Sequence, residues 1–425
     1  MAEPQVATSP FLDRGVSARQ VEASAIAGSA PAEGPLRVLL VAPQPFYEDR
    51  GTPIAVRQVA EALGVLGYST DLLTYPIGRN IDLPGTTIVR APNPLGMRRV
   101  RIGFSTRKLI LDAALTGALA ARLRRIRYDV IHAVEEAAFP AVFFGRRIGV
   151  PVLYDMQSSL PDQLRNHLLF RNALVQHVLH RCERWLLERA DMVVASSGLA
   201  EQVMRAVPSV SMREWHFPSS RQVVSLDTVQ NLREDLRIPD HARVVLYSGS
   251  FEPYQGLSEL LAALPAVVRA MGSVVLVLVG GSGPGCAELR RQAAALDVSR
   301  WVRVRERQPR DELPRFLALA QVVVSPRAYG GNAPLKVFDY LAAGKPIVAS
   351  NPSCHRALLA EDRALLVPHT AADLARAITA VLSDPALAAR LSAGALAFAE
   401  SRLHTAGFVQ AVGELYEDLL GRKRQ

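Results

Sequence analysis

Residues 321–350 read QVVVSPRAYGGNAPLKVFDYLAAGKPIVAS. The apolar runs at 321–325 and 346–350 predict two buried strands. Between them, Pro334 favours the first turn of a helix and Gly344 favours its end. The segment therefore predicts a strand, a Gly-Gly-Asn loop, a helix and a second, parallel strand. Units of this kind build open parallel sheets with helices on both faces.

The same alternation of strand and helix continues on both sides of this segment. Helical patterns at 52–66, 107–127 and 174–189 fall between short runs that are rich in Val, Ile and Leu. No short repeat appears, so the chain is not a solenoid. The predicted strands are 36–42, 69–74, 86–90, 129–133, 151–155 and 191–196 in the first half, and 243–248, 273–279, 301–304, 321–325 and 346–350 in the second.

A chain of 425 residues exceeds what one hydrophobic core usually organises, so we expect two Rossmann-like domains. The stretch 207–225, with its Pro and Ser residues and no sustained period, is the candidate linker. Doubly wound sheets bind ligands at the carboxyl ends of their strands, which predicts a reaction in the cleft between the domains. The expected parts are a disordered tail at 1–34, a first domain at 35–215, a second domain at 216–400, and a helix at 401–425 that packs back on the first domain.

The composition favours a globular protein from a reducing compartment. Apolar residues make up 49% of the chain and charged residues 21%. The longest apolar stretches fall short of the roughly 20 residues that cross a bilayer, so no transmembrane helix is expected. The cysteines Cys182, Cys286 and Cys354 are odd in number and lack metal-type spacing, which fits a cytoplasm without structural disulfides.

The chain is basic, with a net charge of +9 and 45 Arg among its 49 basic residues. A solvated Arg-rich surface is one interpretation, and attraction to anionic lipid or to a phosphate-bearing acceptor is the other. No stacking-aromatic pattern accompanies the charge, so nucleic acid is not an expected partner. One cluster comprises Arg98, Arg99, Arg101, Arg107 and Lys108, with the apolar residues Phe104, Leu109, Ile110 and Leu111 nearby, and another comprises Arg122, Arg124, Arg125 and Arg127.

The opening segment resembles the donor-binding signature of the retaining GT-B glycosyltransferases of family 4, the group 1 glycosyltransferases. That signature has two acidic residues eight apart and a closing Ala-x-Ala-x-Gly-x-Pro-Val motif, which 339–348 matches well. The resemblance implies that Asp339 holds the nucleotide ribose. The other acid, which meets the sugar ring in the family, is replaced here by Gly330 or Gly331.

Residues 246–256 resemble the turn where the family grips the donor diphosphate with an Arg and a Lys. Ser250 and Gln255 replace those cations here, and neutral groups cannot balance phosphate charge. Another cation should therefore compensate, with Lys336 the leading candidate and Arg327 the second. The resemblance also assigns to the donor site Gly249, Gly256, Gly281, Gly331, Asn332 and Leu335, together with Gly51 and Thr52 of a first-domain loop.

The candidate catalytic residues follow strands of the first domain. Gln157 occupies the place where the family usually carries a His near the reacting carbon. His132 is either a catalytic group or a hydrogen-bonded residue at a strand end. Glu135 and Glu136 are either helix-start acids or acceptor contacts. We take Gln157, His132 and Glu135 as the catalytic candidates.

The resemblance implies a GT-B fold, in which two facing Rossmann-like, doubly wound domains enclose a central cleft. It also implies a hexosyltransferase that moves a sugar from a nucleotide-sugar donor to a saccharide or lipid-linked acceptor, in envelope polysaccharide or glycolipid synthesis. Stabilisation of the leaving phosphate is then the main demand, and neither a cofactor nor a metal is expected.

Two alternative functions stay open at this stage. One is a catalytically silent GT-B subunit that binds or scaffolds a partner, and the other is a sugar-nucleotide epimerase or a phosphorylase that shares the GT-B fold. The expected location is the cytoplasm, with peripheral contact to an anionic membrane surface on the inner face of the plasma membrane.

Overall fold

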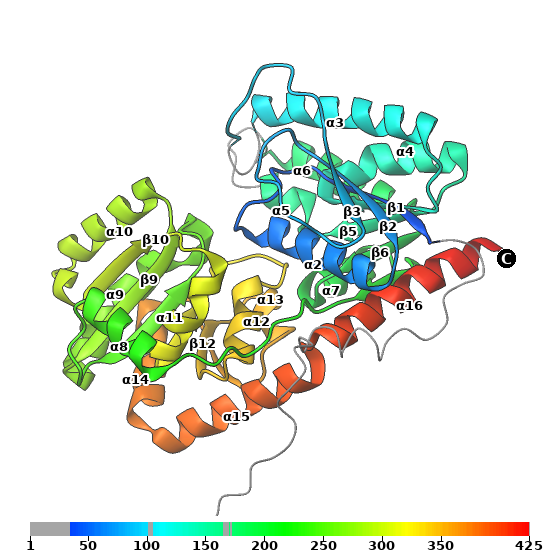
Figure 1. The fold of residues 1–425 in the computed structure, drawn as a ribbon. Helices are drawn as coiled ribbons and strands as arrows, with labels where there is room; N and C mark the ends of the chain where they lie inside the picture. The colour runs from blue at the N-terminus through cyan, green and yellow to red at the C-terminus, as the bar shows by residue number, and fades with distance from the viewer. Residues whose placement is uncertain (1–34, 101–104, 165–169, 171, 425) are drawn as a thin grey trace, which may run out of the picture. The chain divides into compact units, whose positions relative to one another are not determined.

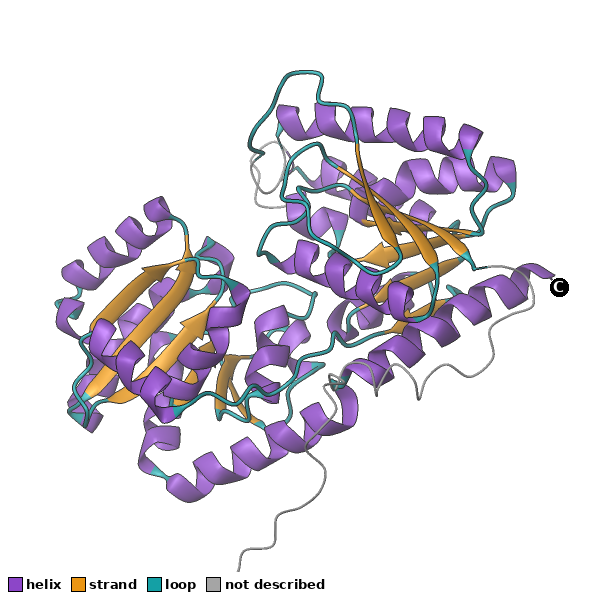
Figure 2. Ribbon diagram, viewed as in Figure 1, coloured by secondary structure: helices purple, strands orange, loops and turns teal. Residues whose placement is uncertain are grey.

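The computed structural model describes residues 35–100, 105–164, 170 and 172–424. The tail predicted at 1–34 and the cluster residues Arg101 and Phe104 therefore lie outside the described residues. The described chain contains two parallel sheets, and each sheet is covered by helices on both faces (Figure 2). This is the doubly wound architecture predicted from the alternating pattern.

The first sheet has the strand order β3-β2-β1-β4-β5-β6-β7, and its neighbouring strands are parallel. The order reverses at β1, which pairs with β2 on one side and β4 on the other. Its strands are β1 (Arg37–Ala42), β2 (Ser69–Thr74), β3 (Thr86–Arg90), β4 (Val130–Val134), β5 (Val152–Met156), β6 (Met192–Ala195) and β7 (Met212–Glu214).

The second sheet has the order β10-β9-β8-β11-β12-β13, also with parallel neighbours. Here the order reverses at β8, which pairs with β9 and β11. Its strands are β8 (Arg243–Ser248), β9 (Val274–Gly281), β10 (Val302–Glu306), β11 (Val322–Ser325), β12 (Ile347–Ser350) and β13 (Ala364–Val367).

The helices are labelled in Figure 1. The first sheet is accompanied by α2 (Gly51–Val65), α3 (Thr106–Arg125), η1 (Glu135–Ala137), α4 (Ala138–Ile148), α5 (Leu160–Leu164), α6 (Ala173–Leu187) and α7 (Ser197–Ala206). The second is accompanied by α8 (Leu226–Asp235), η3 (Pro253–Gln255), α9 (Leu257–Met271), α10 (Gly283–Ala295), η4 (Ser299–Trp301), η5 (Arg310–Glu312), α11 (Leu313–Leu319), α12 (Leu335–Ala342), α13 (Ser353–Arg356) and α14 (Ala371–Ser383). The chain continues through α15 (Pro385–Arg402) and α16 (Thr405–Arg424).

Strand β1 shows why these runs are apolar throughout rather than alternating. Val38 and Leu40 join a core that includes α2, whereas Leu39 and Val41 join a separate core with α3 and α4. Both sets are fully buried. Each such side chain contributes about 1.5–3 kcal/mol of burial free energy, and this gain holds helices to both faces.

Two strands differ from the prediction. The stretch 207–225, expected to be a linker, contains β7, which pairs with β6 at the edge of the first sheet. The strand β13 was not predicted. Both are short and only partly buried, so neither shows the continuous apolar run by which the other strands were found.

The last helix, α16, packs against α2 of the first sheet although it follows the second sheet in the chain (Figure 1). Its Tyr416 is fully buried, and the hydroxyl group lies 2.8 Å from Nδ1 of His132 in β4. The C-terminal segment thus completes the core of the first sheet. None of the helices in the described ranges is long and apolar enough to span a bilayer.

Candidate active site

A pocket of about 820 Å³ is lined by loops that follow strands of both sheets. The first sheet contributes residues that follow each of its strands, β1 to β7, and the second contributes the end of β9 and residues that follow β8, β10 and β11. These are the carboxyl ends of the strands, and the lining includes both points where strand order reverses. Ligand sites of doubly wound sheets form at such points.

Lys336 lies in the first turn of α12, as predicted, and is only 9% exposed. Its ammonium group donates to Oε1 of Gln255 at 2.8 Å and lies 3.9 Å from the centre of the Tyr247 ring. Burial and the nearby Arg327 guanidinium lower the pKa of Lys336 well below its usual value. The lysine therefore has a polar contact and a cation–π contact but no balancing negative charge from them.

Arg327 is a second buried cation in the lining, 6% exposed. It donates to the Tyr329 carbonyl, to the Asn332 carbonyl and to the Asn332 side chain. No carboxylate of the described residues lies within ion-pair distance of Arg327 or Lys336. Two buried cations without a counter-charge are costly unless an anion binds beside them.

Two glycines bring backbone close to these cations. Gly249 has φ +136°, and a Cβ atom there would lie 3.3 Å from the Lys336 ammonium. Gly330 has φ +124°, and a Cβ atom would lie 2.4 Å from the Arg327 guanidinium. A glutamate at position 330 would thus be disfavoured by both backbone and space. The acid missing from the signature leaves room for Arg327.

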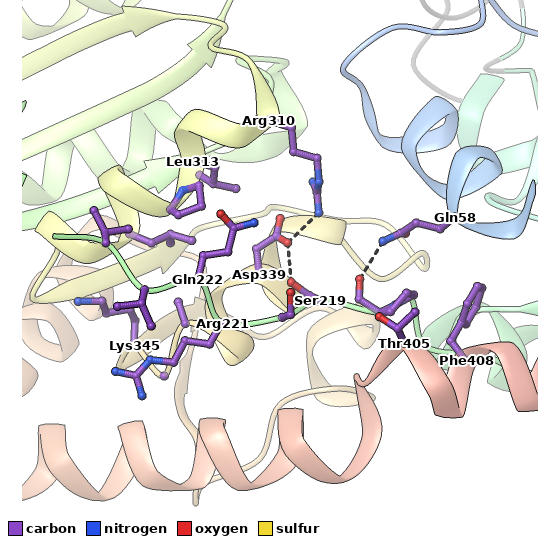
Figure 3. A pocket seen from close by; sticks show the side chains of 18 of the residues that line it. Gln58, Ser219, Arg221, Gln222, Arg310, Leu313, Asp339, Lys345, Thr405 and Phe408 are labelled. Carbon is purple, nitrogen blue, oxygen red and sulfur yellow. Dashed lines mark hydrogen bonds and ion pairs between the residues drawn. The ribbon is translucent and has the colours of Figure 1, made fainter. Parts of the chain in front are cut away.

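Asp339 lies one helical turn beyond Lys336 and lines the same pocket. Figure 3 shows its carboxylate between Arg310, which donates at 2.9 Å, and Ser219, which donates at 2.8 Å. Burial raises the pKa of Asp339, while Arg310 and Ser219 oppose the rise. Arg310 and Asp339 also line a second pocket of about 560 Å³. A ribose hydroxyl that binds Asp339 must share or displace these partners.

Glu135 follows β4 and has φ +52°, a left-handed conformation that is uncommon outside glycine. Its carboxylate accepts from the Ser158 hydroxyl at 2.9 Å and from the Gln163 amide at 2.8 Å. Burial raises the pKa of Glu135 to about 7, and Lys108 opposes the rise. The carboxylate is thus oriented in the pocket with a pKa suited to proton exchange near neutral pH.

Gln157 also lines the pocket, and its amide donates to Asp155 at 2.7 Å. His132 does not line it. The imidazole ring is fully buried between Tyr416 and Asp155, with Nε2 3.6 Å from Oδ2 of Asp155. This placement favours the alternative in which His132 is a hydrogen-bonded strand residue.

Most of the other predicted donor residues are brought together in the lining. Gly256 and Gly281 are not: a Cβ atom at Gly256 would meet the Pro326 carbonyl, and one at Gly281 would meet the Phe251 ring. Both glycines allow close packing behind the pocket. Those in the lining, besides the residues already described, are Gly51, Thr52, Ser250, Gln255, Gly331, Asn332 and Leu335.

The sequence interpretation missed the cations Arg50, Arg307 and Arg310, which all line the pocket. Arg307 and Arg310 follow the carboxyl end of β10. Ligands of doubly wound sheets bind at such strand ends, so this position is a signal in the sequence that indicates both residues. Among the described residues, no group of three or more His, Cys, Asp or Glu side chains could hold a metal ion.

Lys108, expected in a surface cluster, instead points to the pocket and forms ion pairs with Glu136 and with Asp112, the latter at 3.6 Å. Arg122 is likewise engaged, with Asp71 at 2.8 Å and with the Tyr128 hydroxyl at 3.1 Å. Leu111, Leu115 and Leu119 form the buried face of α3. Because Lys108 and Arg122 lie on the same face by helical spacing, both side chains point toward the protein. The remaining exposed members of the clusters are Arg98, Arg99, Arg107, Arg124, Arg125 and Arg127, with Leu109 and Ile110 exposed on α3.

Comparison with known proteins matches both halves of the chain to family models. Residues 228–397 match "Glycosyl transferases group 1", and residues 50–216 match "Glycosyl transferase 4-like domain". The phosphatidyl-myo-inositol mannosyltransferase of Mycolicibacterium smegmatis is 27% identical over 87% of this chain and 89% of its own length. The 2-deoxystreptamine glucosyltransferase of Streptomyces kanamyceticus is 25% identical over 87% of this chain and all of its own length.

Solved structures share the fold. Sucrose-phosphate synthase from Thermosynechococcus elongatus superposes with a TM-score of 0.77 at 23% identity, covering 91% of this chain and 100% of its own. HepE of Anabaena in complex with UDP-glucose superposes with a TM-score of 0.71 at 16% identity, covering 90% of this chain and 100% of its own. The predicted GT-B fold is thereby confirmed.

Proposed function

The chain belongs to the group 1 family of GT-B glycosyltransferases, and on that premise we propose that it transfers a hexose from a nucleotide-sugar donor with retention of configuration. The acceptor is a saccharide or a lipid-linked acceptor of envelope polysaccharide or glycolipid synthesis.

The observation that carries this proposal is the pair of buried cations without a counter-charge, Lys336 and Arg327. A nucleoside diphosphate would supply the missing negative charge at the point where strand order reverses in the second sheet. Gln255, which replaces a family cation, accepts a hydrogen bond from Lys336. This contact supports the view that the lysine compensates for the lost charge.

In this mechanism the second-sheet wall stabilises the leaving diphosphate. As the bond from the sugar to phosphate breaks, negative charge grows on the phosphate oxygens, and charge-assisted hydrogen bonds from Lys336 and Arg327 strengthen. Asp339 would bind the ribose hydroxyls after exchanging its contact with Ser219 or Arg310. Gln157 and Glu135 line the opposite side, where the acceptor would enter.

The relatives give a range of acceptors rather than one. The names of the two aligned enzymes include a phosphatidylinositol and an aminocyclitol, both of which contain a polyhydroxylated ring. The exposed Arg residues near Leu109 and Ile110 support a weak, salt-sensitive contact with an anionic membrane surface.

The test is thermal stabilisation of the purified chain by a panel of nucleoside diphosphates and their sugars, followed by donor turnover. A ligand that binds only the folded state raises the melting temperature. We expect one nucleotide to stabilise the wild-type protein but not the Lys336→Met variant. Stabilisation without turnover would identify a silent binding subunit, and release of an isomerised nucleotide sugar without acceptor would identify an epimerase. Absence of any stabilisation would refute the proposed donor class.

A further inference from the structure

The first-sheet side of the pocket is acidic. Among the described lining residues on this side, the carboxylates are Asp49, Glu135, Glu136 and Asp162, and the cations are Arg50 and Lys108. Among the described lining side chains, an acceptor that enters beside Glu135 therefore meets more carboxylates than cations, with Asp49 paired to Arg79 at 2.7 Å.

The two cations are already paired. Lys108 lies between Glu136 and Asp112, and Arg50 pairs with Glu48 at 2.8 Å. Neither is free to neutralise an anionic substrate without giving up a carboxylate partner. Within the described ranges, Glu135 and Asp162 have no ion-pair partner, and Glu135 is bound only by neutral donors.

A second observation in the same part of the pocket points to a ligand. Gln44 follows β1, next to the strand that leads to Glu135, and it is 8% exposed. Its backbone carbonyl is fixed by the Thr74 hydroxyl at 2.6 Å, whereas its side-chain nitrogen has no hydrogen-bond partner among the described residues. A buried amide N–H without a partner destabilises the protein, so an acceptor atom is expected opposite it.

We propose that the acceptor unit beside Glu135 is a polyhydroxylated ring that carries no anionic group, and that an ammonium substituent on this ring strengthens its binding. The inference rests on the proposed function, because it names the acceptor class for that site. A ring hydroxyl oxygen can accept from Gln44 while the hydroxyl proton is donated to Glu135 or Glu136. A phosphate can only accept, so it leaves the carboxylates facing it unpaired.

Charge decides between the candidate rings. Two unit charges about 6 Å apart interact by roughly 1–3 kcal/mol for effective dielectric constants between water and a protein surface, which corresponds to several-fold to about a hundredfold in affinity. The interaction with a carboxylate is favourable for an ammonium group and unfavourable for a phosphate group. The difference between two rings that differ only in this substituent should therefore be at least about tenfold.

The experiment measures dissociation constants by ligand-observed NMR for two matched sets, in the presence of the nucleoside diphosphate that stabilises the protein. One set is 6-amino-6-deoxyglucose, glucose and glucose 6-phosphate, and the other is 1-amino-1-deoxy-myo-inositol, myo-inositol and myo-inositol 1-phosphate. In at least one set we expect the amine to bind about tenfold or more tightly than the phosphate, with the neutral ring between them. Glu136→Gln should reduce this ratio by about tenfold.

Glu400→Gln on α15 changes the net charge equally but lines neither pocket, and should leave the ratio unchanged. If Glu136→Gln does not fold, Asp162→Asn serves in its place. Tighter binding of the phosphate ring, or binding of no ring in either set, overturns this inference. Nucleotide binding that is lost in Lys336→Met would still support the proposed donor site, so the two failures are distinguishable.

Discussion

The pocket wall that follows β8–β11 holds four cations and two carboxylates, whereas the wall that follows β1–β6 holds four carboxylates and two cations, counting described lining residues. Both walls arise from the same architecture, with loops at the carboxyl ends of parallel strands. The difference lies only in which side chains those loops carry. A fold supplies two equivalent platforms, and under the proposed function the residue types suit one wall to a diphosphate and the other to hydroxyl groups.

The largest expected effect comes from removing the buried charge on the cationic wall. Lys336→Met keeps the apolar stem but deletes the ammonium group, and should weaken nucleoside diphosphate binding by about 2 kcal/mol or more, roughly thirtyfold. Lys336→Arg should recover only part of this, because a planar guanidinium does not replace a compact ammonium contacting Gln255. Isothermal titration calorimetry measures both values.

The control for Lys336→Met is Arg269→Gln, an exposed cation on α9 that lines neither pocket. The affinity of the Arg269→Gln variant for the nucleoside diphosphate should match that of the wild-type protein. If Lys336→Met folds and binds the nucleotide as tightly as the wild-type protein does, Lys336 is not the main cation for the diphosphate, and Arg327 becomes the candidate for that role.

A smaller effect is expected at the one carboxylate on the cationic wall that is predicted to hold ribose. Asp339→Asn keeps the shape but weakens acceptance from the ribose hydroxyls, so the donor KM should rise about tenfold with little change in kcat. Steady-state kinetics at varied donor concentration tests this. A fall in kcat at constant KM would instead place Asp339 in the stabilisation of the transition state.

On the acidic wall, Glu135 should impose a pH dependence. With a pKa of about 7, its ionised fraction rises about tenfold from about pH 6 to about pH 8, and the carboxylate is the better hydrogen-bond acceptor for a hydroxyl. The acceptor kcat/KM should rise over this range and lose the inflection in Glu135→Gln. An unchanged pH profile in that variant would contradict the role of Glu135.

The same shift predicts a stability effect with a defined sign. The pKa of Glu135 is higher in the folded chain than its usual 4.5, so the folded state holds this proton more tightly. The contribution to the free energy of unfolding is present below about pH 4.5 and is lost as pH rises through about 7. Denaturant unfolding should show this decline in the wild-type protein and not in Glu135→Gln. Lys108 and Asp155 also influence this titration.

The smallest expected effect concerns the outer surface of the first-sheet half, which is basic although its pocket wall is acidic. Arg107→Gln should weaken binding to vesicles with anionic lipid by about 1 kcal/mol or less, and raising salt to about 0.5 M should weaken it further. Vesicle co-sedimentation measures this. Equal binding to neutral vesicles would remove the electrostatic explanation.

Local patterns predicted the framework of the fold because buried parallel strands are continuous apolar runs. Strand β2 has the predicted bounds, 69–74, and β4 lies within one residue of them. β7 escaped detection because a three-residue edge strand with partly exposed side chains has no such pattern. Strand detection therefore depended on burial rather than on β propensity.

Which residues line the pocket could be predicted in part from the sequence, whereas their contacts with distant residues could not. Glu135, which follows the end of β4, and Lys336, which was expected to replace the missing family cations and lies in α12, both line the pocket. The surroundings of His132 and Asp339 were not predictable, since Tyr416 is 284 residues from the former and Ser219 is 120 residues from the latter. Contacts over such separations come from tertiary packing, about which local periodicity carries no information.

The position of α16 has a consequence for how this protein can be divided. Because Tyr416 covers His132 and the helix packs on α2, the half that is first in sequence is not a self-contained folding unit in the chain order. A fragment that stops before β8 would expose the residues of α2 against which α16 packs, and a hybrid that exchanges the second-sheet half between relatives would have to keep residues 405–424 with the first-sheet half. Exchange of halves in this molecule therefore requires two crossover points, because recombination at a single point would separate the first-sheet half from α16.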